Sequence, residues 1–543
     1  MTRRAFVGGM IGGVAATVAR PVLGDLGAAS AAEEGGSVSA TGWGAPWIIT
    51  RAQWGADESL GNHTREFAPL VKAIVHHTAI ENPDPYAEIR AIQRYHVVNN
   101  GWWDIGYNYL IARDGRVFEG RWARDYGLYE VHDAEDTSHN LVVGAHATGH
   151  NRGALGIALM GDYTRRDITP EAFESLADLI AWKFWEHRIT AQGADPYTLA
   201  DGSTQTFPNI IGHGEVVQST CPGNGIHGHL ADLRTAVAQR LVSVRRIQAT
   251  DRYALAAALG SRPTPPDTVF VASGENYPDG LALCPAVIAE NAGFLISARR
   301  ELPRATASGL QQMQPKRIVV VGGPSAISDA TLEAMRPYAP VVERLAGADR
   351  YETAALIAQR QAATFGDKVI VCAGTQYADA LAVGPYAASI KAPILLTDPD
   401  VLPPVTKQAL TSLSPGTIFV VGGPRAVSDA VGKALEAYAP TVRRISGQDR
   451  YDTAIELSRR RGILGDPTVY FVSSAKFQHA LPTGPAAYRA KASFLTVSPG
   501  GIPAAVTDEL KRTRTRSVVL IGDTYAISTE SENFVRNVLL SQA

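Results

Sequence analysis

Cysteine is scarce in this sequence, with only three residues in 543. Secreted domains that depend on disulfides carry more cysteines, usually in even number. We therefore expect no disulfide framework. Cys284 and Cys372 lie in apolar stretches and at different phases of an internal repeat, which favours two buried free thiols over a disulfide between them. Cys221 has a different setting, described below.

Long apolar runs and a strong net charge are also absent. No stretch reaches the roughly 20 apolar residues that span a membrane, so we expect no membrane span in the mature chain. The formal net charge of −2 identifies no partner by itself. Its distribution is uneven, because residues 32–245 carry a balance of −9 and residues 246–543 one of +5. The second part therefore suits an anionic partner better.

The N-terminus has a pattern typical of export. Arg3 and Arg4 precede an apolar, Gly/Ala-rich segment that ends near Val18, and Ala29-Ser30-Ala31 offers small residues for cleavage. The pattern predicts a twin-arginine signal peptide over residues 1–31 and a linker over 32–43. We expect a secreted protein, and its length predicts several domains.

Three histidines stand where two apolar runs end, and a cysteine follows the second run. The run Val71 to Val75 leads into His76-His77, Ile210-Ile211 leads into His213, and Cys221 follows closely. Two imidazoles and one thiolate are three protein ligands for a catalytic zinc ion, whose fourth position is left to water or substrate. Adjacent strand residues point to opposite faces, so only one of His76 and His77 can face the ion.

The surroundings of these residues resemble the peptidoglycan recognition proteins, which share a fold with the zinc-dependent N-acetylmuramoyl-L-alanine amidases of the phage lysozyme type. The resemblance covers residues 44–242 and rests on an ordered set of motifs: Trp47 to Ala56, His76 to Ala79, Asp104 to Ile111, Asp114 to Gly120, Gly144 to Ala147, Gly156 to Tyr163, Gly212-His213 and Cys221-Pro222-Gly223.

The resemblance implies roles for individual residues. It implies Zn2+ as the cofactor, with His76, His213 and Cys221 as ligands. It also implies that Tyr107 assists the chemistry, although a half-buried structural tyrosine is the alternative. Ser219 stands where relatives carry lysine or threonine that supports the anion formed on the carbonyl, and serine brings no charge. His132 and His139, in a long segment over residues 123–141, are expected to belong to a solvated insertion.

The remaining chain contains three copies of one unit of about 100 residues. An Asp-Arg-Tyr box recurs at Asp251, Asp349 and Asp449, and glycines recur at Gly322, Gly422 and Gly522. Continuous apolar strands alternate with helices, which predicts parallel sheets covered on both faces. The glycine loops lack a lysine and a Gly-x-Gly-x-x-Gly order. We therefore expect no phosphate-binding loop, and no nucleic-acid partner.

These copies resemble the type 2 cell-wall-binding repeats of Gram-positive surface proteins, which anchor a protein to anionic wall polymers. We place them at residues 246–341, 344–441 and 443–543. The Asp-Arg-Tyr box is expected to be a structural or inter-repeat contact, with direct polymer contact as the alternative. His479 replaces the acid found at Asp279 and Asp379, so the third copy is expected to differ.

The expected fold class is α/β: an amidase-like domain with a central mixed sheet flanked by helices, then three repeated α/β domains with parallel sheets. The expected function is that of a secreted, cell-wall-associated hydrolase. It would cleave the amide between N-acetylmuramic acid and L-alanine in peptidoglycan, with the repeats bound to an anionic wall polymer. The alternative is a surface protein that binds peptidoglycan without cutting it, but non-cutting relatives usually lack the cysteine that Cys221 supplies.

Overall fold

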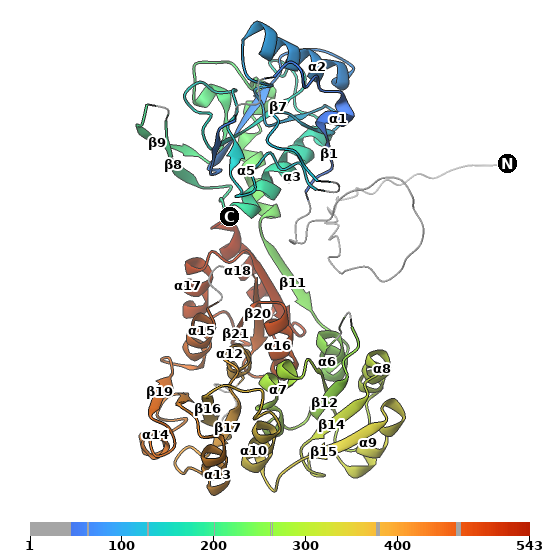
Figure 1. The fold of residues 1–543 in the computed structure, drawn as a ribbon, viewed down its shortest axis with the longest axis vertical. Helices are drawn as coiled ribbons and strands as arrows, with labels where there is room; N and C mark the ends of the chain where they lie inside the picture. The colour runs from blue at the N-terminus through green and yellow to red at the C-terminus, as the bar shows by residue number, and fades with distance from the viewer. Residues whose placement is uncertain are drawn as a thin grey trace, which may run out of the picture. The chain divides into compact units, whose positions relative to one another are not determined.

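The structure is a computed structural model that describes residues 45–543 except 62–64, 128–129, 200, 261, 263, 376–380 and 463–467. The predicted signal peptide and linker lie outside the described residues. The chain divides into two compact units. Unit 1 comprises residues up to 188 together with 195–233, and unit 2 comprises 189–194 together with 234–543 (Figure 1). Within the described part of the chain, no helix has the length and apolarity needed to cross a membrane.

Unit 1 is built on a six-stranded mixed sheet. Its strand order is β1 (Ile48–Ile49), β5 (Val117–Glu119), β4 (Tyr109–Ile111), β7 (Ala154–Leu159), β3 (Lys72–His77) and β10 (Ile210–Gly212). Only the β4–β5 hairpin is antiparallel, and the other pairs are parallel. All residues of β3 and β7 are buried, as expected for central strands covered on both faces. The predicted mixed sheet is confirmed.

The helices of unit 1 begin at recognisable caps. In α2 (Pro85–Arg94) the Asp84 side chain accepts a hydrogen bond from the Tyr86 amide, and in α3 (Pro170–Glu186) Thr169 accepts one from Ala172. A π-helical turn, η1, continues α2 to Asn99. The smaller elements are α1 (Arg51–Trp54), β2 (Phe67–Ala68), β6 (Leu141–Val142), β8 (Ala194–Thr198), β9 (Thr204–Pro208), η2 (His213–Glu215) and α4 (Asn224–His227). Helix α5 (Leu230–Arg240) begins in unit 1 and continues into unit 2 at Arg234.

Unit 2 contains three four-stranded parallel sheets, which confirms the predicted repeats with parallel sheets. The first joins β13 (Gly293–Ser297), β12 (Thr268–Ser273), β14 (Arg317–Val321) and β15 (Val341–Leu345). The second joins β17 (Ile394–Thr397), β16 (Lys368–Ala373), β18 (Thr417–Val421) and β19 (Thr441–Ile445). The third joins β11 (Ser243–Ile247), β22 (Ser517–Ile521), β20 (Thr468–Ser473) and β21 (Ser493–Val497).

The helices of unit 2 cover these sheets. Three of them, one from each repeat, pack against one another: α7 (Leu283–Ala289), α12 (Val383–Ser389) and α16 (Phe477–Arg489) (Figure 1). The others described are α6 (Arg252–Gly260), η3 (Pro278–Gly280), α8 (Arg304–Met313), α9 (Asp329–Glu333), η4 (Arg336–Tyr338), α10 (Arg350–Arg360), α13 (Pro404–Leu413), α14 (Asp429–Leu435), α15 (Arg450–Arg460), α17 (Ala504–Arg512) and α18 (Thr529–Leu540).

Each sheet of unit 2 takes its last strand from outside its own repeat. β15 and β19 precede the Asp-Arg-Tyr boxes of the second and third repeats, yet they pair with β14 and β18 of the preceding ones. The third sheet is completed by β11, which precedes the Asp-Arg-Tyr box of the first repeat and pairs with β22 from Ser243–Ser517 to Ile247–Ile521. The three repeats therefore form one closed, interlocked unit.

The Asp-Arg-Tyr boxes have structural roles. The Asp349 carboxylate accepts hydrogen bonds from the amides of Tyr351 and Glu352 and so caps α10, and Asp449 caps α15 in the same way. Arg350 donates a hydrogen bond to the Gly374 carbonyl at the end of β16. These contacts agree with the structural role predicted for the box.

Candidate metal centre

His76 lies near the carboxyl end of β3, between β7 and β10, and is 1% exposed. His77, the next residue, faces away from it. The His77 Nδ1 atom accepts a hydrogen bond from the Tyr163 amide at 3.2 Å and lies 3.9 Å from the Asp162 carboxylate. The alternation of a strand thus separates the two histidines, and His77 holds the segment that follows β7.

His213 and Cys221 reach the same place from the neighbouring strand. β10 ends at Gly212, so His213 emerges beside His76, and the two ring centroids are 4.4 Å apart. The following loop turns back through a hydrogen bond of 2.6 Å from the Gly214 amide to the Cys221 carbonyl. A side chain on Gly214 would collide with this loop, because its Cβ would lie 2.8 Å from that carbonyl oxygen.

The three predicted ligands converge. One ligand atom from each of His76, His213 and Cys221 lies within 4.8 Å of the others, and no other such grouping of His, Cys, Asp and Glu occurs among the residues that the structure describes. With Zn–N distances of about 2.0 Å and a Zn–S distance of about 2.3 Å, tetrahedral N and S ligands lie about 3.6 Å apart. The distance from His76 Nδ1 to Cys221 Sγ is 3.7 Å. These residues therefore fit a zinc ion.

Burial sets the protonation of the three side chains. It lowers the pKa of His76 well below its usual value, and the neighbouring His146 and His213 lower it further. Burial also lowers the pKa of His213. Both imidazoles are therefore neutral near pH 7 and can offer a lone pair. Burial raises the pKa of the Cys221 thiol to about 11, so metal binding has to displace its proton.

Tyr107 lies two residues before the start of β4, with its ring centroid 5.3 Å from that of His76. Burial raises the pKa of its hydroxyl, and the nearby Cys221 raises it further, so the hydroxyl keeps its proton. It can therefore donate a hydrogen bond. His96 packs against Tyr107 at 5.6 Å and accepts a hydrogen bond from the Gly106 amide at 3.1 Å.

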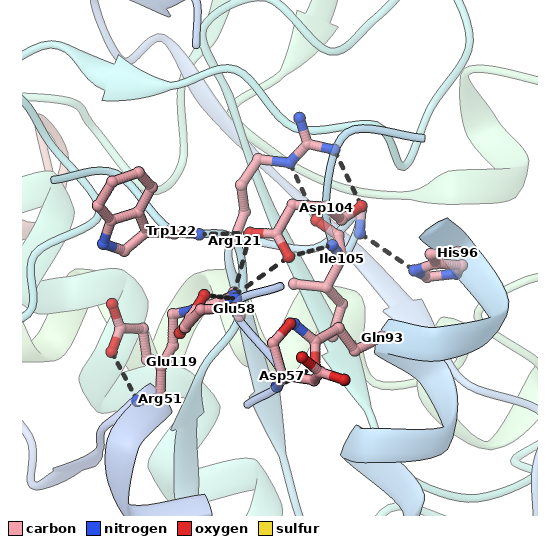
Figure 2. A network of polar contacts seen from close by, with 12 residues as sticks. Arg51, Asp57, Glu58, Gln93, His96, Asp104, Ile105, Glu119, Arg121 and Trp122 are labelled. Carbon is pink, nitrogen blue, oxygen red and sulfur yellow. Dashed lines mark hydrogen bonds and ion pairs between the residues drawn. The ribbon is translucent and has the colours of Figure 1, made fainter. Parts of the chain in front are cut away.

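A buried polar network fixes the turn that precedes Tyr107 (Figure 2). Asp104 accepts hydrogen bonds from Arg51 at 3.0 Å and from the Trp122 amide at 2.9 Å. Arg121 donates to the Ile105 carbonyl at 2.9 Å. Paired charges and satisfied carbonyls rigidify this turn. The network thus holds Tyr107 through its backbone.

Ser219 lies in the same loop as Cys221, but its side chain is exposed. Its hydroxyl oxygen accepts a hydrogen bond from the Cys221 amide at 3.1 Å. In this arrangement Ser219 shapes the loop, and its hydroxyl hydrogen remains available to a ligand. Its catalytic role remains a prediction.

The segment over residues 123–141 is packed more closely than predicted. The His139 side chain is 81% exposed, as expected of a solvated insertion. His132 differs, because its Nδ1 atom lies 2.7 Å from the Glu119 carboxylate and its ring stacks on Tyr126. The side chain of His132 is 25% exposed, so the solvated setting expected for it is met only in part. The sequence did not show that the buried carboxylate of Glu119 takes His132 as a partner.

One residue of the centre had no predicted role. His146, from the Gly144–Ala147 motif, is buried, and its Nδ1 atom lies 3.0 Å from His76 Nε2. The only signal in the sequence is a histidine two residues after a glycine in a short motif.

Two families match this chain. The N-acetylmuramoyl-L-alanine amidase family matches residues 67–224, and cell wall binding domain 2 (CWB2) matches residues 246–332, 344–432 and 444–532. Peptidoglycan-recognition protein SC2 of Drosophila melanogaster is 31% identical over 184 residues, which are 33% of this chain and 82% of that protein.

Two bacterial relatives match larger parts of the chain. The N-acetylmuramoyl-L-alanine amidase LytC of Bacillus subtilis is 28% identical over 301 residues, 55% of this chain and 59% of LytC. The amidase enhancer of Bacillus subtilis is 29% identical over 53% of this chain and 40% of its own length. The chain thus spans about half the length of these two relatives. Cwp6 from Clostridium difficile shares the fold, with a TM-score of 0.50, 21% identity and coverage of 55% of this chain and 48% of Cwp6.

Proposed function

Because the chain belongs to the family of peptidoglycan recognition proteins and N-acetylmuramoyl-L-alanine amidases, we propose that unit 1 hydrolyses peptidoglycan with the aid of zinc. The bond cleaved is the amide between the lactyl group of N-acetylmuramic acid and L-alanine. The observation that carries this proposal is the convergence of His76, near the end of β3, with His213 and Cys221, which follow the adjacent strand β10.

Each residue of the centre has a task in this proposal. His76, His213 and Cys221 hold the zinc ion, which, when bound, supplies a Lewis acid and a nucleophile by lowering the pKa of water to about 7. The hydroxyl of Tyr107 donates a hydrogen bond to the substrate carbonyl oxygen as negative charge develops there. The exposed hydroxyl of Ser219 offers a second hydrogen-bond donor. Tyr107 is half-buried, and this limited access of water strengthens its hydrogen bond.

The test is mass analysis of muropeptides after purified sacculi are digested with the whole protein. Release of free stem peptides that begin with L-alanine supports the proposal. Binding to sacculi without release would favour the alternative, a peptidoglycan-binding surface protein. The presence of Cys221, which completes a three-ligand set, favours hydrolysis over binding alone.

For unit 2 we propose binding to an anionic polymer of the cell wall. Its support is the match of three CWB2 segments and the balance of +5 over residues 246–543. The predicted twin-arginine signal peptide would deliver the protein to the wall. Co-sedimentation with native walls and with acid-stripped walls tests this. Binding should fall with stripping and with salt, because charge contacts are screened over about 8 Å at physiological ionic strength. Equal binding to both wall preparations would contradict it.

A further inference from the structure

We infer that His146 is a positioning residue for the metal centre, and that it acts by fixing which ring nitrogen of His76 faces the metal. The inference rests on the proposed zinc site and adds to it a residue that the three-ligand set does not include. The evidence is a chain of contacts that begins at a backbone carbonyl and ends at the ligand atom.

The first contact determines the tautomer of His146. Its Nε2 atom lies 3.3 Å from the carbonyl oxygen of Ala154, on β7. A carbonyl oxygen only accepts, so His146 Nε2 carries the hydrogen. A neutral imidazole carries a hydrogen on one ring nitrogen only, so the Nδ1 atom of His146 has a free lone pair.

The second contact passes this choice to His76. His146 Nδ1 accepts, so the His76 Nε2 atom at 3.0 Å must donate. A neutral His76 that carries its hydrogen on Nε2 presents a bare Nδ1, and this is the atom that lies 3.7 Å from Cys221 Sγ. A single main-chain carbonyl therefore fixes the tautomers of both rings, as outer hydrogen bonds do for metal-binding histidines in general.

The space around His146 is shaped for a ring in this place. Its edge lies against Gly144 and Gly156, and a side chain on either glycine would overlap it. The loop is held by Asn151, whose side-chain oxygen accepts hydrogen bonds of 2.8 Å from the amides of His146 and Ala147. His146 therefore has no room to turn its ring away. This close packing explains why a glycine stands at position 144 of the Gly144–Ala147 motif.

The test compares two substitutions of His146 in the full chain. Asparagine places its side-chain oxygen close to the Nδ1 position and so keeps the acceptor for His76, whereas leucine fills the space without one. We expect His146→Leu to weaken zinc binding about 10- to 100-fold, as the loss of an outer partner does elsewhere, and His146→Asn to recover most of that loss. Competition with a chromophoric chelator measures both. His139→Leu, at an exposed site, is the control and should bind zinc as the wild type does.

A second measurement needs no metal. In metal-free protein labelled with 15N-histidine, the long-range NMR correlations of His76, assigned by their loss in His76→Gln, should show the hydrogen on Nε2. A hydrogen on Nδ1 would overturn the inference, as would wild-type zinc affinity in His146→Leu. If His146→Leu does not fold, the tautomer and the asparagine variant decide. A wild type that binds no zinc would refute the proposed function alone, since the tautomer is measured without zinc.

Discussion

The guanidinium of Arg246 forms an ion pair of 2.9 Å with Glu532, which lies 286 residues further along the chain. The same guanidinium donates to the carbonyls of Gly522, Asp523 and Ile527. Arg246 belongs to β11, so it fastens the strand that closes unit 2 onto the end of the third sheet. Arg344 and Arg444 make the equivalent contact with the carbonyls of Gly322 and Gly422.

Arg246→Ala should therefore loosen the closure of unit 2. Three carbonyls and one carboxylate lose their donor; a hydrogen bond to a charged group contributes about 1.5–3 kcal/mol net, and water replaces the donor at the acceptors that the truncation exposes. We expect a loss of stability of about 2 kcal/mol, seen in calorimetry as a lower unfolding temperature of unit 2. Arg245→Ala, at the exposed neighbouring position, is the matched control. Equal effects of both substitutions would show that the contacts of the Arg246 guanidinium contribute nothing to the stability of unit 2.

The helices at the middle of unit 2 supply a second prediction. A Cβ on Gly384 of α12 would lie 2.6 Å from Cys284 Cβ and 3.0 Å from its Sγ. The side chain of Cys284, on α7, therefore occupies the space beside Gly384. Gly384→Ala should destabilise unit 2 by about 1–3 kcal/mol through overpacking.

Removing the neighbouring side chain tests that cause. The double variant Cys284→Gly, Gly384→Ala should be more stable than the sum of the two single effects predicts, because the added methyl group then has space. Gly366→Ala, where no atom lies within 4 Å of the added carbon, is the control. Additive effects in the double variant would contradict the packing argument.

The sequence predicted what local patterns encode. Apolar runs that end in histidine indicated strands delivering His76 and His213 to one edge, and the structure brings both side chains together with Cys221. Periodic copies predicted the parallel sheets of unit 2. Two contacts between distant segments were not predicted, because no local pattern marks them. β11 pairs with β22 some 270 residues away, and His146, from the segment before β7, contacts His76 of β3.

Tyr107→Phe should separate chemistry from metal binding. The ring remains and the hydroxyl is lost, so the fold and the zinc content should not change. If the hydroxyl supports charge on the carbonyl oxygen, kcat should fall about 100- to 1000-fold with little change in KM. Tyr95→Phe, at an exposed tyrosine of unit 1, is the control. A Tyr107→Phe enzyme with a wild-type kcat would leave Tyr107 with a purely structural role.

The stability of unit 1 should depend on pH through Glu135. Burial alone would raise the pKa of Glu135, but hydrogen bonds and charge from His187 and Lys183 outweigh it and lower the pKa to about 2. A glutamate in the unfolded chain has a pKa of about 4.3. The lowered pKa therefore contributes stability that is fully present above pH ~4.3 and is lost as the pH falls toward 2. Unfolding temperatures measured across this range should fall, and Glu135→Gln should remove that part of the dependence. An unchanged slope in Glu135→Gln would contradict the assignment.

Cys221→Ser should abolish both zinc binding and hydrolysis. A serine hydroxyl stays protonated near neutral pH, whereas a cysteine thiol gives up its proton to a metal even though burial raises the pKa of the Cys221 thiol to about 11 in the metal-free protein. Metal analysis should find about one zinc per wild-type chain and less than about a tenth of that in Cys221→Ser, with the circular dichroism spectrum unchanged.

Two further substitutions sharpen this test. Cys221→Asp restores an anionic ligand and should keep measurable but weaker zinc binding, because carboxylates also ligate zinc. Cys372→Ala removes a buried thiol of unit 2 and should change neither zinc content nor hydrolysis. If Cys221→Ser cleaves sacculi at more than a few per cent of the wild-type rate, the thiolate does not hold the catalytic ion. If Cys372→Ala loses zinc as Cys221→Ser does, the zinc measured is not specific to the proposed centre. His76 and His213 would then need a third zinc ligand other than Cys221.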